Sequence, residues 1–191
     1  PQLHISLDAA NALLSKTGFS ISDCQTKIDE KKKPLSMNLT TKSQIEVNAV
    51  YEKNVRTMNV IAMIEGSDPK LQEDYVIIGA HLDHVGSQAG LLFPGANDNA
   101  SGSAAVLEIA KAFVKGGIQP KRSVIFVLFA SEEQGLNGAK HFVESWNKGY
   151  DKIAAMINLD CIGYGDSIQV GNGKSAPKLW DIANEIDETS F

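Results

Sequence analysis

Apolar residues follow two different patterns along this chain, with a change near residue 66. Before it, residues 35–64 alternate between apolar and polar positions, which predicts antiparallel strands in a meander interrupted near residues 53–54. After it, three runs are almost wholly apolar, as expected of strands covered on both faces: residues 75–80, 123–130 and 153–159. The sequence therefore predicts a buried sheet in the second part of the chain.

Helical periodicity occurs between these apolar runs. Residues 101–115 carry Val106, Ile109 and Phe113 at helical spacing, and helices are also predicted at residues 136–146 and 176–188. A short strand is predicted at residues 167–170. Strands that alternate with helices favour right-handed crossovers and a largely parallel sheet. We therefore expect an α/β fold, with helices on both faces of a mixed, mainly parallel sheet.

The first 34 residues are more polar. A short strand is predicted at residues 3–6, followed by a helix at residues 8–16 that Ser6 or Asp8 would cap and whose apolar face includes Ala9, Ala12 and Leu13. Residues 23–34 are rich in charged side chains and are predicted to form a loop or an exposed hairpin.

Composition narrows the classes of function. The net charge of −5 provides no basic surface for nucleic acid, and the lysine run at residues 31–33 is typical of a solvated loop. No stretch reaches the roughly 18 apolar residues of a membrane span. The two cysteines, Cys24 and Cys161, have no metal-binding or redox spacing, so either one disulfide or two buried thiols fit them.

Acidic side chains and one histidine stand where the apolar runs end. His81 and Asp83 follow the first run, Glu132 and Glu133 the second, and Asp160 the third; Asp98 lies in a loop before a predicted helix. Reactive groups gather at the carboxyl ends of strands in open α/β sheets. We therefore expect these residues, distant in sequence, to converge on one edge of the sheet.

Each segment also has a purely structural interpretation. Asp83 could fix the ring of His81 for a metal, or the pair could be a core histidine with its partner. Asp98 could reach two ions, or Asp98, Asn99 or Ser101 could cap the next helix. Adjacent glutamates are common in exposed loops, whereas the apolar surroundings of Asp160 make an unpartnered carboxylate costly there.

Carboxylate and imidazole ligands without cysteine favour catalytic zinc, with cobalt or manganese as alternatives. Two ions bridged by one carboxylate would polarise a carbonyl and activate a water. A nearby glutamate would take the proton of that water and pass it to the leaving amine. The predicted chemistry is hydrolysis of an amide.

Taken together, the segments resemble the co-catalytic dizinc aminopeptidases, a family related to glutamate carboxypeptidases and glutaminyl cyclases. The matching stretches are Gly79-Ala80-His81-Leu82-Asp83, Gly95-Ala96-Asn97-Asp98-Asn99-Ala100-Ser101-Gly102, Ser131-Glu132-Glu133-Gln134-Gly135-Leu136 and Asn158-Leu159-Asp160. The resemblance implies a peptide substrate and two zinc ions. It implies the following roles: His81 and Asp160 on one zinc, Asp98 bridging, Glu133 on the second, Glu132 as general base and Asp83 as partner of His81.

The resemblance also implies a domain organisation. Residues 1–44 would be the end of an inserted protease-associated domain with a connector, and residues 45–191 an incomplete zinc peptidase domain. The family's second zinc takes a further histidine from a segment after Asp160, and no histidine follows His141 here. We therefore expect a partial chain with a weak second zinc site, in which His141 is a surface residue and His84 lies outside the ligand shell. Secretion is usual in the family, which implies an extracellular or periplasmic location.

Three alternatives to the aminopeptidase stay open at this point. A carboxypeptidase and a single-zinc glutaminyl cyclase would use the same scaffold. A non-catalytic binding or dimerisation module would keep the scaffold without the chemistry. The number of zinc ions separates them: two ions favour a peptidase, one ion a cyclase, and none the module.

Overall fold

The computed structural model describes residues 4–48, 50–52, 54–88, 90–167 and 169–190. The chain divides into two compact units, residues 1–53 and residues 54–191. The sequence-based division between residues 44 and 45 concerns domains of a family and stays a prediction. So does the assignment of residues 1–44 to a protease-associated domain.

The first unit contains two helices, α1 (Leu7–Leu14) and α2 (Ile21–Lys31). Ser6 caps α1, as predicted, because its side chain accepts a hydrogen bond from the N–H of Ala9. The predicted apolar face is wrong, since Leu14 is the buried residue of this helix and Ala9 and Ala12 are exposed. Residues 4–6 form no strand, and residue 3 lies outside the described residues.

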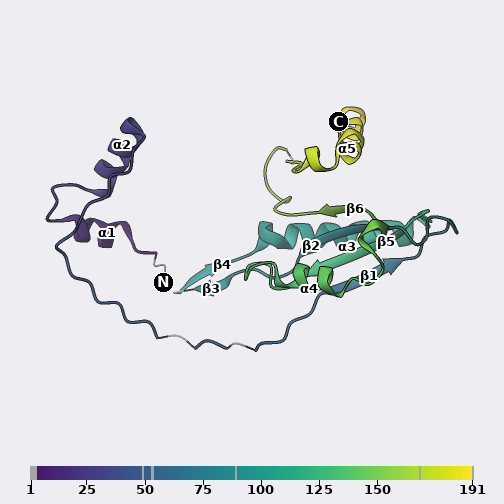
Figure 1. Ribbon diagram of the computed structural model, residues 1–191, viewed down its shortest axis with the longest axis horizontal. Coiled ribbons are helices and arrows are strands. Elements are labelled where there is room, and N and C mark those ends of the chain that lie inside the picture. Colours follow the sequence, from purple (N-terminus) through teal and green to yellow (C-terminus); the bar gives the residue numbers. More distant parts are fainter. Residues whose placement is uncertain (1–3, 49, 53, 89, 168, 191) are drawn as a thin grey trace. The chain divides into compact units, whose positions relative to one another are not determined.

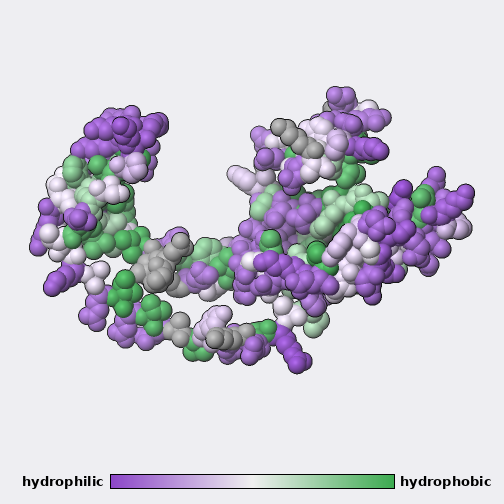
Figure 2. All heavy atoms as spheres, in the orientation of Figure 1, coloured by the Kyte–Doolittle hydropathy of each residue, from purple (hydrophilic) through white to green (hydrophobic). Residues whose placement is uncertain are grey.

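Helix α2 replaces the loop or hairpin predicted at residues 23–34. Ser20 and Asp23 form a capping box: each side chain accepts a hydrogen bond from the other residue's backbone N–H, which satisfies groups that a helix start leaves free. The helix has no buried residue, and its surface is mostly hydrophilic in Figure 2. The charged segment is therefore a solvated helix, and the spacing of Ser20 and Asp23 is the signal in the sequence that could have identified it.

The meander predicted at residues 35–64 is also wrong. Among the described residues of this range, only β1 (Val60–Ile64) is a strand. Alternating apolar residues such as Ile45, Val47 and Tyr51 are exposed instead. Alternation gives a segment one apolar face, but a strand also needs a neighbour that accepts its backbone hydrogen bonds.

The second unit is built on a four-stranded sheet with the order β1-β5-β2-β6, shown in Figure 1. Strands β2 (Tyr75–His81), β5 (Ser123–Phe129) and β6 (Ile153–Asn158) run parallel, while β1 pairs with β5 in the antiparallel sense. This confirms the expected α/β class with a mixed, mainly parallel sheet.

Helices cover both faces of the sheet. Helix α3 (Gly102–Lys115) presents Val106, Ile109, Ala110 and Phe113 to one face. Helix α4 (Asn137–Ser145) presents Ala139 and Phe142 to the opposite face. Both helices lie where periodicity predicted them, so the three-layer arrangement is confirmed. The remaining elements are β3 (Gly86–Gln88), β4 (Leu91–Phe93), η1 (Ala96–Ser101), η2 (Tyr150–Lys152), η3 (Gly173–Ser175) and α5 (Pro177–Ser190).

Burial differs among the three apolar runs. Strand β5 is buried along its whole length and β2 nearly so, as predicted. Strand β6 is not, since Met156 and Ile157 are exposed. It lies at the end of the strand order, so only β2 pairs with it among the described residues. Residues 167, 169 and 170 form no strand, and residue 168 of that prediction lies outside the described residues.

The membrane span and the state of the two cysteines were also considered from the sequence. No helix in the part of the chain that the structure describes has the length and apolar character needed to cross a membrane. Both cysteines are free thiols, and Cys24 is half-buried while Cys161 is exposed. The prediction of two buried thiols is therefore wrong.

The register of the parallel strands aligns their carboxyl ends. His81 is opposite Phe129 of β5, and Gly79 is opposite Asn158 of β6. Residue 160 follows β6 by two positions, as residue 81 follows Gly79. Residues 81, 132 and 160 therefore emerge at the same edge of the sheet.

Asn99 fastens the start of α3 to the segment after β6. Its side-chain amide donates to the carbonyl of Leu159, while its oxygen accepts from the N–H groups of Gly102 and, at 3.4 Å, Cys161. Of the residues that could cap α3, Asn99 therefore makes the hydrogen bond to a backbone N–H at the helix start. The hydroxyl of Ser101 instead donates to the carbonyl of Asn97 and accepts from the N–H of Ile162.

Gly102 allows this close approach. A Cβ atom built at this position would lie 2.3 Å from the carbonyl oxygen of Leu159 and 2.5 Å from Oδ1 of Asn99. Any larger residue would force the helix away from the end of β6. The segments that carry Asp98 and Asp160 are thus held together by main-chain contact and by one buried side chain.

We predict that Asn99→Ala lowers the free energy of unfolding by about 2–4 kcal/mol, because it leaves buried donors and acceptors without partners. Asn97→Ala is the matched control. It removes a single hydrogen bond, from the N–H of Gly163 to the Asn97 oxygen at a partly exposed site, and should cost about 1 kcal/mol. Urea unfolding followed by circular dichroism measures both values. Equal losses for the two variants would contradict the fastening role of Asn99.

Candidate metal centre

His81 is the last residue of β2, and its side chain is only 4% exposed. Its Nδ1 lies 2.9 Å from the backbone carbonyl oxygen of Asp83. A carbonyl can only accept, so Nδ1 carries the proton and donates it. The lone pair of Nε2 is therefore available to a cation, which is the arrangement typical of histidines that bind metals.

The carboxylate of Asp83 has a different task from the one expected. It lies 4.0 Å from Nδ1 of His81, so the main chain of Asp83, and not its side chain, orients the ring. The carboxylate accepts hydrogen bonds from the backbone N–H groups of Glu132 at 2.9 Å and Glu133 at 3.3 Å. It thereby holds the loop after β5 against the segment after β2.

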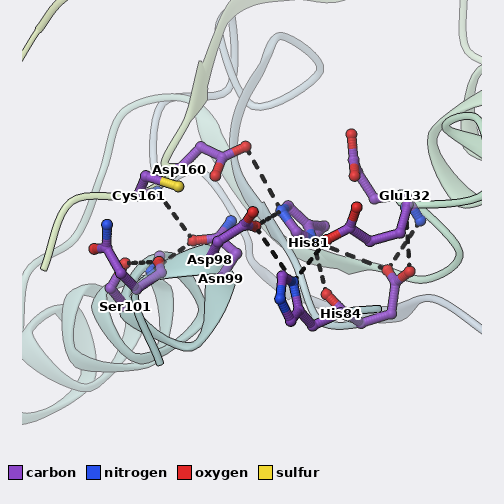
Figure 3. Close-up of polar contacts among 12 residues, drawn as sticks. His81, His84, Asp98, Asn99, Ser101, Glu132, Asp160 and Cys161 are labelled. Atoms are coloured by element: carbon purple, nitrogen blue, oxygen red, sulfur yellow. Dashed lines mark hydrogen bonds and ion pairs between the residues drawn. The ribbon is translucent and has the colours of Figure 1, made fainter. Parts of the chain in front are cut away.

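A first cluster forms around Nε2 of His81, as Figure 3 shows. Oδ1 of Asp98 lies 3.1 Å from Nε2, and Oδ2 of Asp160 lies 3.6 Å from it. One ligand atom from each of these three residues can be chosen so that all lie within 4.8 Å of one another. The loop before α3 and the segment after β6 supply the two carboxylates, so the predicted convergence of these three residues is observed.

The charges around His81 favour a cation. Burial by itself would lower the pKa of His81, because it disfavours the imidazolium form. The hydrogen bond to the Asp83 carbonyl acts in the opposite direction, as do the carboxylates of Asp160, Glu132 and Asp98. The net effect raises the pKa of His81 above its ordinary value. The cluster thus attracts positive charge, whether it comes as a proton or as a metal ion.

A second cluster contains His84, Asp98 and Glu133. Nδ1 of His84 lies 2.7 Å from Oε1 of Glu133 and 3.8 Å from Oδ1 of Asp98. His84 thus touches the carboxylate of a predicted ligand, which fits its expected place outside the ligand shell, and that placement stays a prediction. Asp98 belongs to both clusters, and its Oδ1 lies 3.1 Å from Nε2 of His81 and 3.8 Å from Nδ1 of His84.

The carboxylates are less buried than the sequence indicated. The side chains of Asp98 and Asp160 are 45% and 43% exposed, and that of Glu133 is 23% exposed. The apolar surroundings inferred for Asp160 do not enclose it, because β6 is itself largely exposed. Close approach to His81, and not burial, distinguishes this aspartate from an ordinary surface residue.

Glu132 lies on a cavity of about 180 Å³ beside the first cluster. Figure 3 shows Glu132 on one side of His81 and Asp160 on the other. The cavity is lined by His81, Phe129, Glu132, Leu136, Ala139, Met156, Asn158 and Asp160. An apolar pocket with a few convergent charged groups is the usual form of a small-molecule site. His141, by contrast, is exposed on α4, as expected.

Two residues that directly adjoin Glu132 and Asp160 in the sequence have a left-handed backbone although they are not glycines. Ser131, directly before Glu132, has a φ of 52°, and Cys161, directly after Asp160, also has a φ of 52°. Such conformations are costly for residues with a Cβ atom and cluster at functional sites. At Ser131 and at Cys161 the chain turns directly beside an acidic residue that follows a strand.

The donor set fits a zinc site. Each cluster offers one imidazole nitrogen and two carboxylate oxygens, which are donor types that zinc binds, and catalytic zinc ions take three protein ligands. Nδ1 of His84 is buried, and Glu133 at 2.7 Å is not aligned with it for a hydrogen bond, so the nitrogen has no hydrogen-bond partner among the described residues. A cation beside both atoms would satisfy them.

Residues 59–190 match the sequence pattern of Peptidase family M28. An aminopeptidase of Pseudomonas aeruginosa (strain UCBPP-PA14) is 38% identical over 128 residues, which cover 65% of this chain and 22% of that protein. Leupeptin-inactivating enzyme 1 of Streptomyces exfoliatus is 42% identical over 106 residues, which cover 55% of this chain and 22% of that protein. The structure of BSAP, a zinc aminopeptidase from Bacillus subtilis, matches with 30% identity and a TM-score of 0.47, covering 55% of this chain and 24% of that one. The chain thus spans about a quarter of the length of these relatives. Because the family pattern extends over well more than half of the sequence, this chain belongs to Peptidase family M28.

Proposed function

We propose that this chain carries the catalytic centre of a zinc-dependent aminopeptidase, which hydrolyses the N-terminal peptide bond of peptides with two zinc ions and Glu132 as general base. One observation carries the proposal. Two ligand clusters share Asp98, and each adds one imidazole and one further carboxylate at the carboxyl edge of the parallel strands.

The ligands divide between the two ions. His81 and Asp160 would hold the first ion and Glu133 the second, with Asp98 between them. When bound, zinc supplies Lewis-acid chemistry: it polarises a carbonyl and lowers the pKa of water. The residues around it fix its position, since the Asp83 carbonyl orients His81 and Asn99 holds the segment before Asp160.

The surroundings of Glu132 support a role in proton transfer. Its side chain lines the cavity that also contains His81 and Asp160, and the Asp83 carboxylate fixes its backbone N–H. A carboxylate there can take a proton from the attacking water and deliver it to the amine that leaves. Glu133 diverges from it toward His84, so the two adjacent glutamates have separate tasks.

The names of relatives support an aminopeptidase in preference to a carboxypeptidase. The relative from Pseudomonas aeruginosa is an aminopeptidase, and relatives from Arthroderma benhamiae and Trichophyton verrucosum are probable leucine aminopeptidases, each 32% identical to this chain. The apolar lining of the cavity, from Phe129, Leu136 and Met156, suits an uncharged side chain of the substrate.

We predict that Glu132→Gln lowers kcat for an aminoacyl p-nitroanilide by about 10²–10⁴, because an amide of the same shape cannot accept the proton of the water. Zinc content should stay close to that of the unchanged chain, since Glu132 is not a ligand in this proposal. Glu144→Gln, on the exposed side of α4, is the matched control and should keep full activity.

Steady-state kinetics and zinc analysis by mass spectrometry measure both quantities on the full chain. A Glu132→Gln variant that retained most of its turnover would remove this residue from the general-base role. A zinc-loaded chain that hydrolyses no aminoacyl substrate would contradict the aminopeptidase itself.

We also predict that Asp98→Ala lowers the content of both zinc ions, from two per chain to fewer than one, because a bridging carboxylate serves each of them. Asp187→Ala, at an exposed position of α5, should leave two ions bound. Loss of a single ion from Asp98→Ala would speak against the bridge. An unchanged chain with one ion would favour cyclase-like chemistry, and a chain with none a non-catalytic module.

A further inference from the structure

We propose that Asn59 is a positioning residue of the centre: its side-chain amide holds the glutamate loop (residues 131–137), which carries Glu132 and Glu133. The inference rests on the proposed function, because that function assigns the two glutamates their tasks. Three features carry it: the two hydrogen bonds of one amide, a close approach at a glycine, and the strained backbone of the loop.

Asn59 lies directly before β1, a strand that contributes no residue to either cluster. The antiparallel register places Val60 opposite Leu128, so Asn59 stands beside the end of β5. Its Oδ1 accepts a hydrogen bond from the N–H of Ala130 at 3.0 Å, and its Nδ2 donates to the carbonyl of Gly138 at 2.8 Å. Ala130 directly precedes the glutamate loop and Gly138 directly follows it. One amide therefore joins both ends of this loop.

An asparagine suits this position because its amide pairs one acceptor with donors, as a peptide unit does. The partners fix its orientation: the N–H of Ala130 requires an oxygen, and the carbonyl of Gly138 requires a nitrogen. A third hydrogen bond, from the N–H of Gly138 to the carbonyl of Ala130 at 2.9 Å, closes a ring among the three residues. Ala130 is buried, so the loss of its acceptor would be costly.

Gly138 allows the amide to lie between the two ends of the loop. A Cβ atom at this position would overlap Oδ1 of Asn59 and the carbonyl oxygen of Ala130. Any larger residue would therefore push the start of α4 away from the end of β5 and open the ring of hydrogen bonds.

The glutamate loop requires support because its backbone is strained. Ser131 and Leu136, near its two ends, have φ values of 52° and 61°, a left-handed conformation that is costly for residues with a Cβ atom. The Asp83 carboxylate holds the two glutamates through their backbone N–H groups. Asn59 holds the ends of the loop, so the positions of both glutamates depend on a residue outside the site.

The effect of Asn59 on the centre is indirect. The residue belongs to neither cluster and does not line the cavity beside Glu132. A displaced loop would act on proton transfer through Glu132 and on cation binding through Glu133. Misplacement of a reacting group by about 1 Å can lower a rate by about 10²-fold.

The test compares Asn59→Ala with Ser123→Ala in the full chain. Ser123 is the matched control because its hydroxyl makes similar hydrogen bonds at the opposite end of β5. It accepts from the N–H of Gly66 at 3.0 Å and donates to the carbonyl of Gln72 at 2.7 Å. Both variants should lose stability to urea, whereas only Asn59→Ala should change the properties of the centre.

At saturating zinc, Asn59→Ala should lower kcat for an aminoacyl p-nitroanilide by about 10–100-fold, with KM changed by less than about threefold. In a chain that also carries Glu132→Gln, the further loss should shrink to less than about threefold, because Asn59 acts through this glutamate. Titration with zinc chloride should show the site of Glu133 weakened by about 10–100-fold, and the site of His81 and Asp160 unchanged.

Hydrogen exchange of the metal-free chain tests the hydrogen bonds themselves and requires neither zinc nor turnover. In the unchanged chain the N–H of Ala130 should be protected, since the Asn59 side chain is its acceptor. In Asn59→Ala, the N–H groups of Ala130 and Gly138 should exchange more than about tenfold faster. Ser123→Ala should instead accelerate exchange at Gly66, whose N–H loses its acceptor.

The outcomes separate this inference from the proposed function. An Ala130 N–H that exchanges freely in the unchanged chain would overturn the role of Asn59, even if the variant did not fold. Equal effects of Asn59→Ala and Ser123→Ala on kcat and on zinc affinity, or a full further loss in the Glu132→Gln chain, would also overturn it and leave the aminopeptidase intact. A chain that binds no zinc and hydrolyses no aminoacyl substrate would remove the proposed function and the positioning role together.

Discussion

The parallel pairing of β2 with β5 and β6 is the constraint on which the rest of this structure depends. Its register places the ends of three strands on one edge, so His81, Glu132 and Asp160 emerge together although about 80 residues separate the first from the last. Neither helices nor loops could achieve this alone. The helices matter because they bury the two faces of the sheet and make the pairing stable, with Val106 of α3 and Phe142 of α4 on opposite sides.

Continuous apolar runs were the reliable signal in the sequence, because a strand buried on both faces has few alternatives. They predicted β2 and β5, and the helices between them followed from their periodicity. Alternation was misleading at residues 35–59, since one apolar face does not supply a pairing strand. Charge was misleading at α2, where the spacing of Ser20 and Asp23 carried the information and composition did not.

The sequence predicted which residues form the site better than it predicted the contacts between them. Residue types and strand ends led to His81, Asp98, Glu133 and Asp160, and the structure brings them together in two clusters. The hydrogen bonds could not be predicted, because they depend on how the chain turns after each strand. The contact of His84 with Glu133 could not be predicted for the same reason: three residues after a strand, the direction of a side chain is set by the local turn, and no periodicity describes it.

The carboxylate of Asp83 joins two parts of the centre that perform different tasks. It accepts the N–H groups of Glu132 and Glu133, while the carbonyl of the same residue orients His81. A displacement of this one residue would move Glu132, the proposed general base, together with His81 and Glu133, one member of each cluster. The position of the proposed general base and the positions of the proposed metal ligands are thus mechanically coupled through a single side chain and its own carbonyl.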